Sequence, residues 1–465
     1  MKKVSAVQTR DCVVLYRQKR ERGLRVRTKR ELTALGLALA AFYLCFAFLD
    51  GALLYPDSEG YITMSVAREP MYPLFLALIR LLFPAGIWMQ AAVIVQSLLS
   101  AFAAWFFALR LSKLFDTGRG LAWALALCAV LPSLMCRFLA GRHAMYSNAM
   151  LSESLALPLF LVFFTCLLDF CLRGRTRELL LAAGLALLLF CTRKQMAVTL
   201  PLLLLAGLWR AIRERRFLAR AGLSLALCLA VLLGSRALDR AYNYALRGEA
   251  IAHTGDMRFV STMLFYTATE KDADTIEDGE LRGLYTEILA LAEQRELTAR
   301  SAPADWYGRS MHFLYSYDPI QFDCLRDTIE PWCEKRVGGG TALELEKDRV
   351  YDAFNAALLP VSLPRLLHTA CDSFLMGLVT TVLTMHRLLI LPALALYAVY
   401  LLLWIFSLRR EREAVLGALS LASILGTVAL VSLTIFCQSR YTIYNMPMFY
   451  ASLLLMARGL VRGRA

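Results

Sequence analysis

Long apolar segments alternate with short basic connections along most of this chain, and this alternation constrains the fold more than any other feature. A helix needs ~20 predominantly apolar residues to cross a bilayer. With 58% hydrophobic residues, 19% charged residues and a mean hydropathy of +0.53, the chain is too apolar for a soluble globular protein. The sequence therefore predicts an all-α polytopic membrane protein.

About ten membrane spans are expected. They cover residues 32–54, 87–109, 120–136, 149–171, 178–192, 195–209, 221–236, 388–407, 414–436 and 446–460. Two further apolar segments, 71–84 and 366–385, do not fit as full spans, because counting either alone would send the later basic loops outward. We expect helices in the outer membrane interface at both places, with eleven or twelve spans as the alternative.

The basic connections all fall on one side of the membrane in this count. The first thirty residues hold eleven Lys or Arg, and further clusters occupy 110–119, 173–177, 210–220, 409–412 and the C-terminal tail. Since cytoplasmic loops carry the excess of Lys and Arg, we expect a plasma-membrane protein with both termini cytoplasmic. The net charge of +14 then reflects contact with membrane lipids. We expect no nucleic acid partner, since the basic segment lacks interleaved aromatic residues for base stacking.

The chain divides into four parts. Residues 1–31 form a basic cytoplasmic segment, and residues 32–236 a transmembrane module whose first outer loop is 55–86. Residues 237–364 hold 22 of the 37 Asp and Glu and show helical spacing of apolar residues, which predicts a small, mainly helical extracytoplasmic domain. Residues 365–465 supply the C-terminal interfacial helix and the remaining transmembrane helices. Cys324 and Cys333 lie in the polar part, either as a disulfide or as two unpaired thiols.

Polar side chains gather at the predicted outer ends of the spans. The candidate carboxylates are Asp57, Glu59 and Glu153, and the candidate phosphate-binding residues are Arg68, Arg142, Arg193, Lys194, Arg440 and Tyr441. Carboxylates can act as a general base or hold a divalent cation, whereas Arg and Lys can neutralise a phosphate leaving group. These residue types on one membrane face suit a phosphate-bearing lipid and a polar acceptor.

Each of these residues also has a simpler interpretation. Asp57 could cap a helix that starts near Ser58. Glu153 could be solvated at a helix start, although its place inside an apolar run favours a cavity. The arginines and Lys194 could extend to lipid headgroups.

The order of these motifs resembles the GT-C superfamily of membrane glycosyltransferases. The matching elements are the Asp57-Ser58 loop, the Arg-x-Pro-x-Tyr-Pro-Leu sequence from Arg68 to Leu74, Leu151-Ser152-Glu153-Ser154, Thr192-Arg193 and Ser439-Arg440-Tyr441. Within it, the chain is most similar to the bacterial branch of protein O-mannosyltransferases and lipid A aminoarabinose transferases. The resemblance covers roughly the first 210 residues and the final thirty.

The resemblance implies an inverting enzyme that moves a sugar from a polyprenyl-phosphate donor to a lipid, glycan or protein acceptor outside the membrane. It implies that Asp57 is a base or metal ligand, that Glu153 is the acidic residue opening the fourth span, and that Arg440 contacts the donor phosphate. The sequence reads Asp-Ser-Glu where better-known members carry adjacent acidic residues. The choice of Asp57 or Glu59 as base, and the need for Mg²⁺ or Mn²⁺ at Asp57, therefore stay open.

Two other classes of protein are alternatives. A lipid or polysaccharide transporter or flippase would also place charges near a lipid phosphate, but it should show charged residues at mid-membrane depth and repeated halves. The sequence shows no internal repeat. A non-catalytic assembly protein built on residues 237–364 would leave the charges of the first and last outer loops unexplained.

Overall fold

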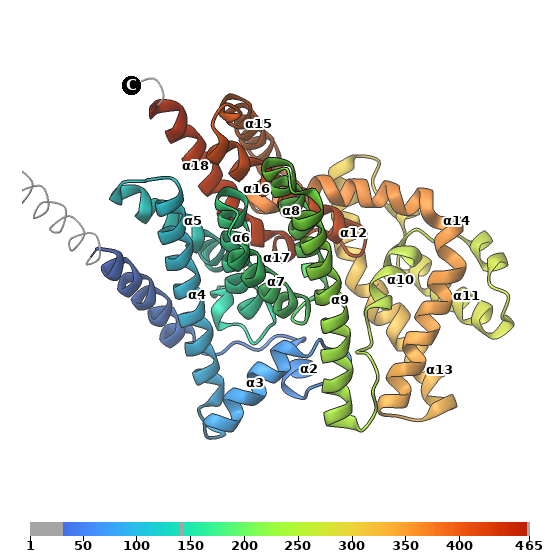
Figure 1. The fold of residues 1–465 in the computed structure, drawn as a ribbon. Coiled ribbons are helices and arrows are strands. Elements are labelled where there is room, and N and C mark those ends of the chain that lie inside the picture. Colours follow the sequence, from blue (N-terminus) through green and yellow to red (C-terminus); the bar gives the residue numbers. More distant parts are fainter. Residues whose placement is uncertain (1–30, 140–142, 463–465) are drawn as a thin grey trace, which may run out of the picture.

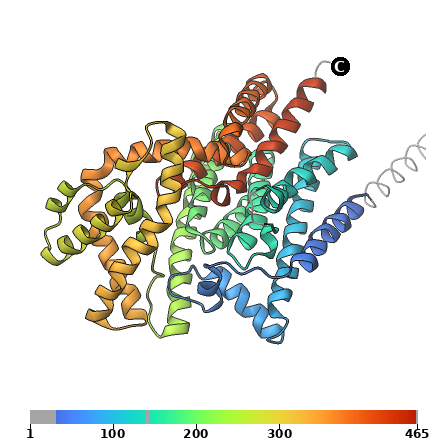
Figure 2. The same ribbon diagram turned by 180° about the vertical axis from the view of Figure 1, so that it is seen from behind.

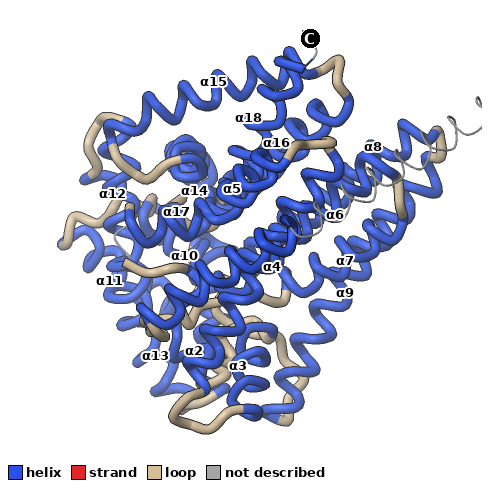
Figure 3. The backbone as a smooth tube through the Cα atoms, turned by 90° about the vertical axis from the view of Figure 1, so that its left-hand side faces the viewer, coloured by secondary structure: helices blue, strands red, loops and turns tan. Residues whose placement is uncertain are grey.

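The computed structural model describes residues 31–139 and 143–462, and these residues are helical apart from loops (Figure 3). Within this part of the chain, the one extended contact is an isolated parallel bridge between Leu53 and Ala149. The predicted all-α class is confirmed for these residues. Nearly all of the basic segment 1–31, together with Arg142, lies outside them.

Eight of the described helices are long and apolar enough to cross a membrane. They are Glu31–Asp50, α4 (Trp88–Leu114), α5 (Arg119–Phe138), α6 (Glu153–Arg173), Lys194–Glu214 with α8 (Thr199–Glu214), α9 (Phe217–Arg247), Arg387–Ser407 with α15 (Ile390–Ser407), and α16 (Glu411–Ser432). Most of α9 and α15 faces outward, with exposed side chains such as Leu225, Leu229, Leu391 and Leu402. The chain is a multi-pass membrane protein.

Two of the ten predicted spans correspond to shorter helices. α7 (Thr176–Phe190) has 15 residues and packs on α6 and α9, while α18 (Met446–Arg462) has 17 residues and packs on α5 and α16. Both are shorter than the ~20 residues of a typical span. The count of ten therefore stays a prediction.

The two doubtful apolar segments behave differently. Residues 71–84 contain α3 (Met71–Leu82), whose 12 residues are too few to cross a bilayer. Residues 366–385 do not begin a new helix, and their place at the membrane interface stays a prediction. They continue α14 (Thr341–Val382), a helix of 42 residues that contains Pro360 and Pro364 and changes direction along its length (Figure 1). The proline rings interrupt the hydrogen-bond ladder without ending the helix.

The acidic region between α9 and α15 forms a helical unit beside the bundle, seen from both sides in Figures 1 and 2. Its elements are α10 (Met257–Tyr266), η3 (Glu270–Thr275), α11 (Gly279–Gln294), η4 (Ala299–Ser301), α12 (Trp306–Pro319), the π-helical η5 (Ile320–Arg326), α13 (Asp327–Val337) and the first part of α14. They enclose one apolar core that includes Phe265, Tyr285, Ile329 and Phe354. Cys324 and Cys333 are both buried there as free thiols.

The predicted boundaries at 236 and 364 both fall inside helices. α9 runs through the first and α14 through the second, so each joins the transmembrane module to the acidic region without a break. A continuous helix constrains the relative orientation of the two parts more than a flexible linker does. The remaining short elements are α2 (Ser58–Ile62), η1 (Tyr146–Asn148), η2 (Lys194–Val198), η6 (Arg387–Leu389), α17 (Ser439–Thr442) and η7 (Ile443–Asn445).

A close crossing of α8 and α9 depends on Gly207. A Cβ atom there would overlap the Ser224 side chain and lie 3.3 Å from the Arg220 carbonyl oxygen. Small residues allow helices to approach closely in membranes.

We expect Gly207→Ala to destabilise the protein by about 1–3 kcal/mol, because α8 and α9 must separate to admit the methyl group. Gly184→Ala in α7 is the matched control, since a Cβ at Gly184 meets nothing within 4 Å. The measurement is the fraction of monodisperse protein left after heating in detergent. Equal melting of the two variants would contradict the close crossing.

Candidate functional site

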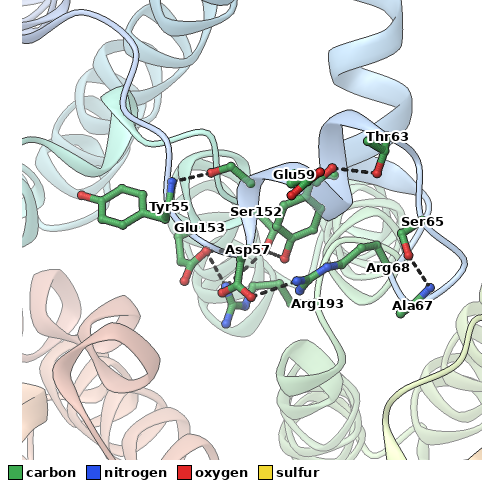
Figure 4. A network of polar contacts seen from close by, with 12 residues as sticks. Tyr55, Asp57, Glu59, Thr63, Ser65, Ala67, Arg68, Ser152, Glu153 and Arg193 are labelled. Atoms are coloured by element: carbon green, nitrogen blue, oxygen red, sulfur yellow. Dashed lines mark hydrogen bonds and ion pairs between the residues drawn. The ribbon is translucent and has the colours of Figure 1, made fainter. Parts of the chain in front are cut away.

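Five side chains form a chain of alternating charge at the ends of several helices, in the order Arg68, Asp57, Arg440, Glu153 and Arg193. We call them the ion-pair chain. Figure 4 shows Arg68, Asp57, Glu153 and Arg193 close together. Arg68 Nη2 lies 2.8 Å from Asp57 Oδ1, and Arg440 Nη2 lies 3.0 Å from Asp57 Oδ2. Arg440 Nε donates to Glu153 Oε1, and Arg193 Nη1 lies 2.6 Å from Glu153 Oε2.

A backbone bridge places the two carboxylates near each other. The amide of Leu53 donates to the Asn148 carbonyl over 2.9 Å, and the amide of Met150 donates to the Leu53 carbonyl over 2.9 Å. These bonds hold the segment before Asp57 alongside the segment before Glu153. Residues almost a hundred positions apart thus reach one site.

The hydroxyl groups of Ser152 and Tyr61 add further hydrogen bonds to the ion-pair chain. Arg193 Nη1 donates to Ser152 Oγ over 3.1 Å, and the Tyr61 and Ser152 hydroxyls are 3.0 Å apart. The Arg68 guanidinium lies 4.7 Å from the centre of the Tyr61 ring. The aromatic face and the hydroxyl restrict where both guanidinium groups can move.

Tyr441 lies between two of the arginines. Its ring centre is 5.7 Å from the Arg193 guanidinium and 5.8 Å from that of Arg440. In this structure, Tyr441 therefore contributes its ring face to the predicted phosphate-binding group.

The ion-pair chain is buried unevenly. The Glu153 side chain is 1% exposed, Arg440 is 15% exposed and Asp57 is 32% exposed. Burial raises the pKa of Asp57, but Arg68 and Arg440 outweigh burial and hold that pKa well below its usual range. Three guanidinium groups against two carboxylates leave one positive charge in surplus, which suits an anionic ligand.

The simpler interpretations of both carboxylates do not hold in this structure. Asp57 precedes α2, but its side chain makes no capping hydrogen bond and binds Arg68 and Arg440 instead. Glu153 is the first residue of α6, yet it is fully buried rather than solvated.

Two other predicted residues lie beside the ion-pair chain. Glu59 is exposed and forms no ion pair with any residue that the structure describes; its backbone carbonyl accepts a hydrogen bond from Thr63 over 2.8 Å. Lys194 uses its backbone amide to bind Glu69 Oε1 over 3.0 Å, and its Nζ lies 3.9 Å from Asp256 Oδ2.

A second group of side chains could hold a cation. Ligand atoms of Glu69, His253 and Asp256 all lie within 4.8 Å of one another. Asp239 Oδ2 is 2.7 Å from His253 Nδ1, and Asp256 Oδ2 is 3.1 Å from His253 Nε2. Burial alone would lower the pKa of His253, but its two carboxylate partners raise that pKa to about 10.

Sequence reasoning missed His253 and Asp256, together with Arg258 in α10. Arg258 is half buried and forms no ion pair with a described residue, and its charge acts on the pKa of Tyr317. The available signal was the short polar sequence His253-Thr254-Gly255-Asp256 after a long helix, which by itself reads as an ordinary loop.

We expect Glu153→Ala to destabilise the protein by about 3–5 kcal/mol, because removing this buried carboxylate leaves Arg193 and Arg440 without their partner. Thermal unfolding in detergent measures the change. Glu59→Ala is the control and should melt within about 0.5 kcal/mol of the wild type, because that side chain is exposed. A Glu153→Ala variant as stable as the control would contradict the importance of this ion pair.

Comparison of the chain with protein-family models, with curated proteins and with solved structures finds no match.

Proposed function

We propose that this protein is a glycosyltransferase of the plasma membrane that moves a sugar from a polyprenyl-phosphate donor to an acceptor outside the membrane. One observation carries the proposal: three guanidinium groups and two carboxylates from separate segments form the ion-pair chain where long apolar helices end. A lipid phosphate bound at these helix ends would have its hydrocarbon chain beside the apolar helices.

The arginines would bind the donor phosphate by exchanging partners. Arg68 and Arg440 each donate one N–H group to Asp57, and phosphate oxygens are acceptors of the same kind. Bound to phosphate, these groups neutralise the negative charge that develops when the sugar–phosphate bond breaks. Glu153 stays buried beneath Arg193 and Arg440 and keeps both in position.

Asp57 has two consecutive roles in this scheme. Before the donor arrives, it holds Arg68 and Arg440 at the spacing that a phosphate needs, so that little reorganisation is required on binding. When the donor takes over the guanidinium groups, Asp57 loses part of the attraction that lowers its pKa. It then faces the sugar as an ionised carboxylate.

A divalent cation, where the enzyme uses one, fits Glu69, His253 and Asp256 better than Asp57. Both oxygens of Asp57 are engaged by arginines, whereas the second group offers an imidazole nitrogen and two carboxylates, with Asp239 orienting the ring. Such an ion would supply a fixed positive charge and join the first outer loop to the loop before α10. Binding would release the proton from His253.

We expect Asp57→Asn to lower turnover about 100-fold, because misplaced arginines no longer match the transition state. The assay measures release of polyprenyl phosphate from a radiolabelled donor by purified protein, over a panel of sugars and acceptors. Glu59→Gln is the control and should keep wild-type turnover. If wild type releases no polyprenyl phosphate with any donor, the proposed function is wrong, and translocation of labelled donor in vesicles would favour a flippase instead.

We expect added Mn²⁺ or Zn²⁺ to raise the melting temperature of the wild type but not of His253→Ala, because only the wild type has the imidazole ligand. The same titration on Asp57→Asn should still show the shift. If Asp57→Asn loses the increase in melting temperature and His253→Ala keeps it, the cation binds at Asp57 instead.

A further inference from the structure

A cleft separate from the ion-pair chain lies between the acidic helical unit and the middle of α14. Its volume is about 460 Å³, within the range of ~300–1,000 Å³ that is usual for ligand pockets. The end of α10, the loop after it, η4 and α14 form its walls. The polar residues that line it include Thr267, Thr269, Arg300, Arg365, His368 and Thr369. We call this space the basic cleft.

The charge of the basic cleft is opposite to that of the unit around it, which holds most of the Asp and Glu of the chain. Arg300, Arg365 and His368 line the cleft, whereas no Asp or Glu of the described residues does. Arg300 Nη1 lies 2.8 Å from Glu293 Oε1, and Arg365 Nη2 lies 2.6 Å from Asp272 Oδ2. Each guanidinium has five N–H donors, so one carboxylate leaves donors for a ligand. A cleft with cations and no carboxylate in its walls favours an anion.

Hydroxyl groups and apolar surface complete the walls of the basic cleft. Thr267 Oγ1 donates to the Met263 carbonyl over 3.3 Å, and Thr369 Oγ1 donates to the Arg365 carbonyl over 3.3 Å. Each of these oxygens keeps lone pairs that can accept a hydrogen bond from a sugar hydroxyl. Ala299 and Pro364 also line the cleft. Cations, hydroxyl acceptors and small apolar side chains together suit a sugar that carries an anionic group.

A smaller space of about 150 Å³ shares part of its wall with the basic cleft and contacts the segment that carries Arg440. Ser373 and Phe313 line this smaller space. The Cys437 amide donates to Ser373 Oγ over 2.9 Å, and the ring centres of Phe313 and Phe436 are 6.4 Å apart. These two contacts hold the chain just before Arg440. The smaller space therefore extends from the basic cleft to residues next to the ion-pair chain.

We propose that the basic cleft binds the acceptor of the transfer reaction, and that this acceptor is a sugar bearing a carboxylate or phosphate group. The inference rests on the proposed function and names the class of its acceptor. Arg300 and Arg365 bind the anionic group by charge-assisted hydrogen bonds. The threonine hydroxyls accept hydrogen bonds from the sugar, and the acceptor extends along the smaller space toward Arg440.

Binding is measured by saturation-transfer NMR on the full-length protein in a detergent without a sugar headgroup. The probes are glucuronic acid and glucose 6-phosphate, and glucose is the neutral control. We expect both anionic sugars to bind at least about tenfold more tightly than glucose, which lacks the charged group. Inorganic phosphate at equal concentration should not displace glucuronic acid. Equal displacement would show that the cleft binds a free anion, and would overturn the inference.

Octyl glucuronide identifies the source of the anionic sugar. Tighter binding of octyl glucuronide than of glucuronic acid supports a glycolipid acceptor. Equal binding of the two probes supports a soluble glycan.

Arg300→Gln tests whether the sugar binds in the basic cleft. We expect it to weaken glucuronic acid binding about tenfold, because one charge-assisted hydrogen bond is lost. Arg295→Gln is the matched control and should bind as the wild type does. Arg295 and Arg300 are 48% and 52% exposed and each pairs with one carboxylate, but Arg295 does not line the cleft.

A second variant fills the cleft instead of changing its charge. Ala299 is exposed and lines both spaces, so the indole of Ala299→Trp should abolish glucuronic acid binding. Ala342→Trp is its control, because Ala342 is also exposed and lines neither space. Equal melting temperatures of the two variants show that both are folded. If Ala299→Trp does not fold, Arg300→Gln carries the test.

The polyprenyl-phosphate release assay links the cleft to the reaction. With an acceptor that supports release, Arg300→Gln should raise the KM for that acceptor about tenfold and leave kcat and the donor KM unchanged. Wild-type protein that binds neither anionic sugar, or an Arg300→Gln variant that matches Arg295→Gln in binding and acceptor KM, would overturn the inference and leave the proposed function standing. Wild-type protein that binds anionic sugars but releases no polyprenyl phosphate would instead overturn the proposed function, and the acceptor role with it.

Discussion

Two carboxylates at helix ends hold three guanidinium groups, and the segments that meet at this site depend on these contacts. Charges removed from water are stable only when each finds a partner with good geometry. Glu153 is almost fully buried, so the segments carrying Arg193 and Arg440 must meet α6 there. The positions of the turn before η2 and of α17 follow from that requirement.

Tyrosine rings and a backbone bridge around the ion-pair chain restrict its side chains to one conformation. Long arginine side chains have many rotamers, and ordering them costs conformational entropy. Tyr61 and Tyr441 cover guanidinium faces, and the bridge at Leu53 fixes the backbone before Asp57. Much of the ordering that the proposed phosphate ligand would require is thus already present in the protein alone.

Individual residues show which parts of the site could be predicted from the sequence. Asp57, Glu153, Arg193 and Arg440 were selected because charges beside apolar runs need a reason, and these four lie in one network. The same rule selected Glu59, which the turn of α2 leaves exposed. It missed His253 and Asp256, because both lie in a polar region where charged residues are common. Their positions depend on how the acidic helical unit packs against the bundle, which no local pattern encodes.

Hydropathy and charge by themselves determined that this chain is helical and crosses a membrane several times, because only helices or closed barrels satisfy backbone groups in lipid. They did not determine the lengths of α7 and α18, or that α14 continues through Pro360 and Pro364, since tertiary packing can sustain a helix past a proline. The tertiary structure alone decided which charges meet. Asp57 and Arg440 are 383 residues apart, and a pair at that separation forms only when the packing of the whole bundle brings both loops to one place.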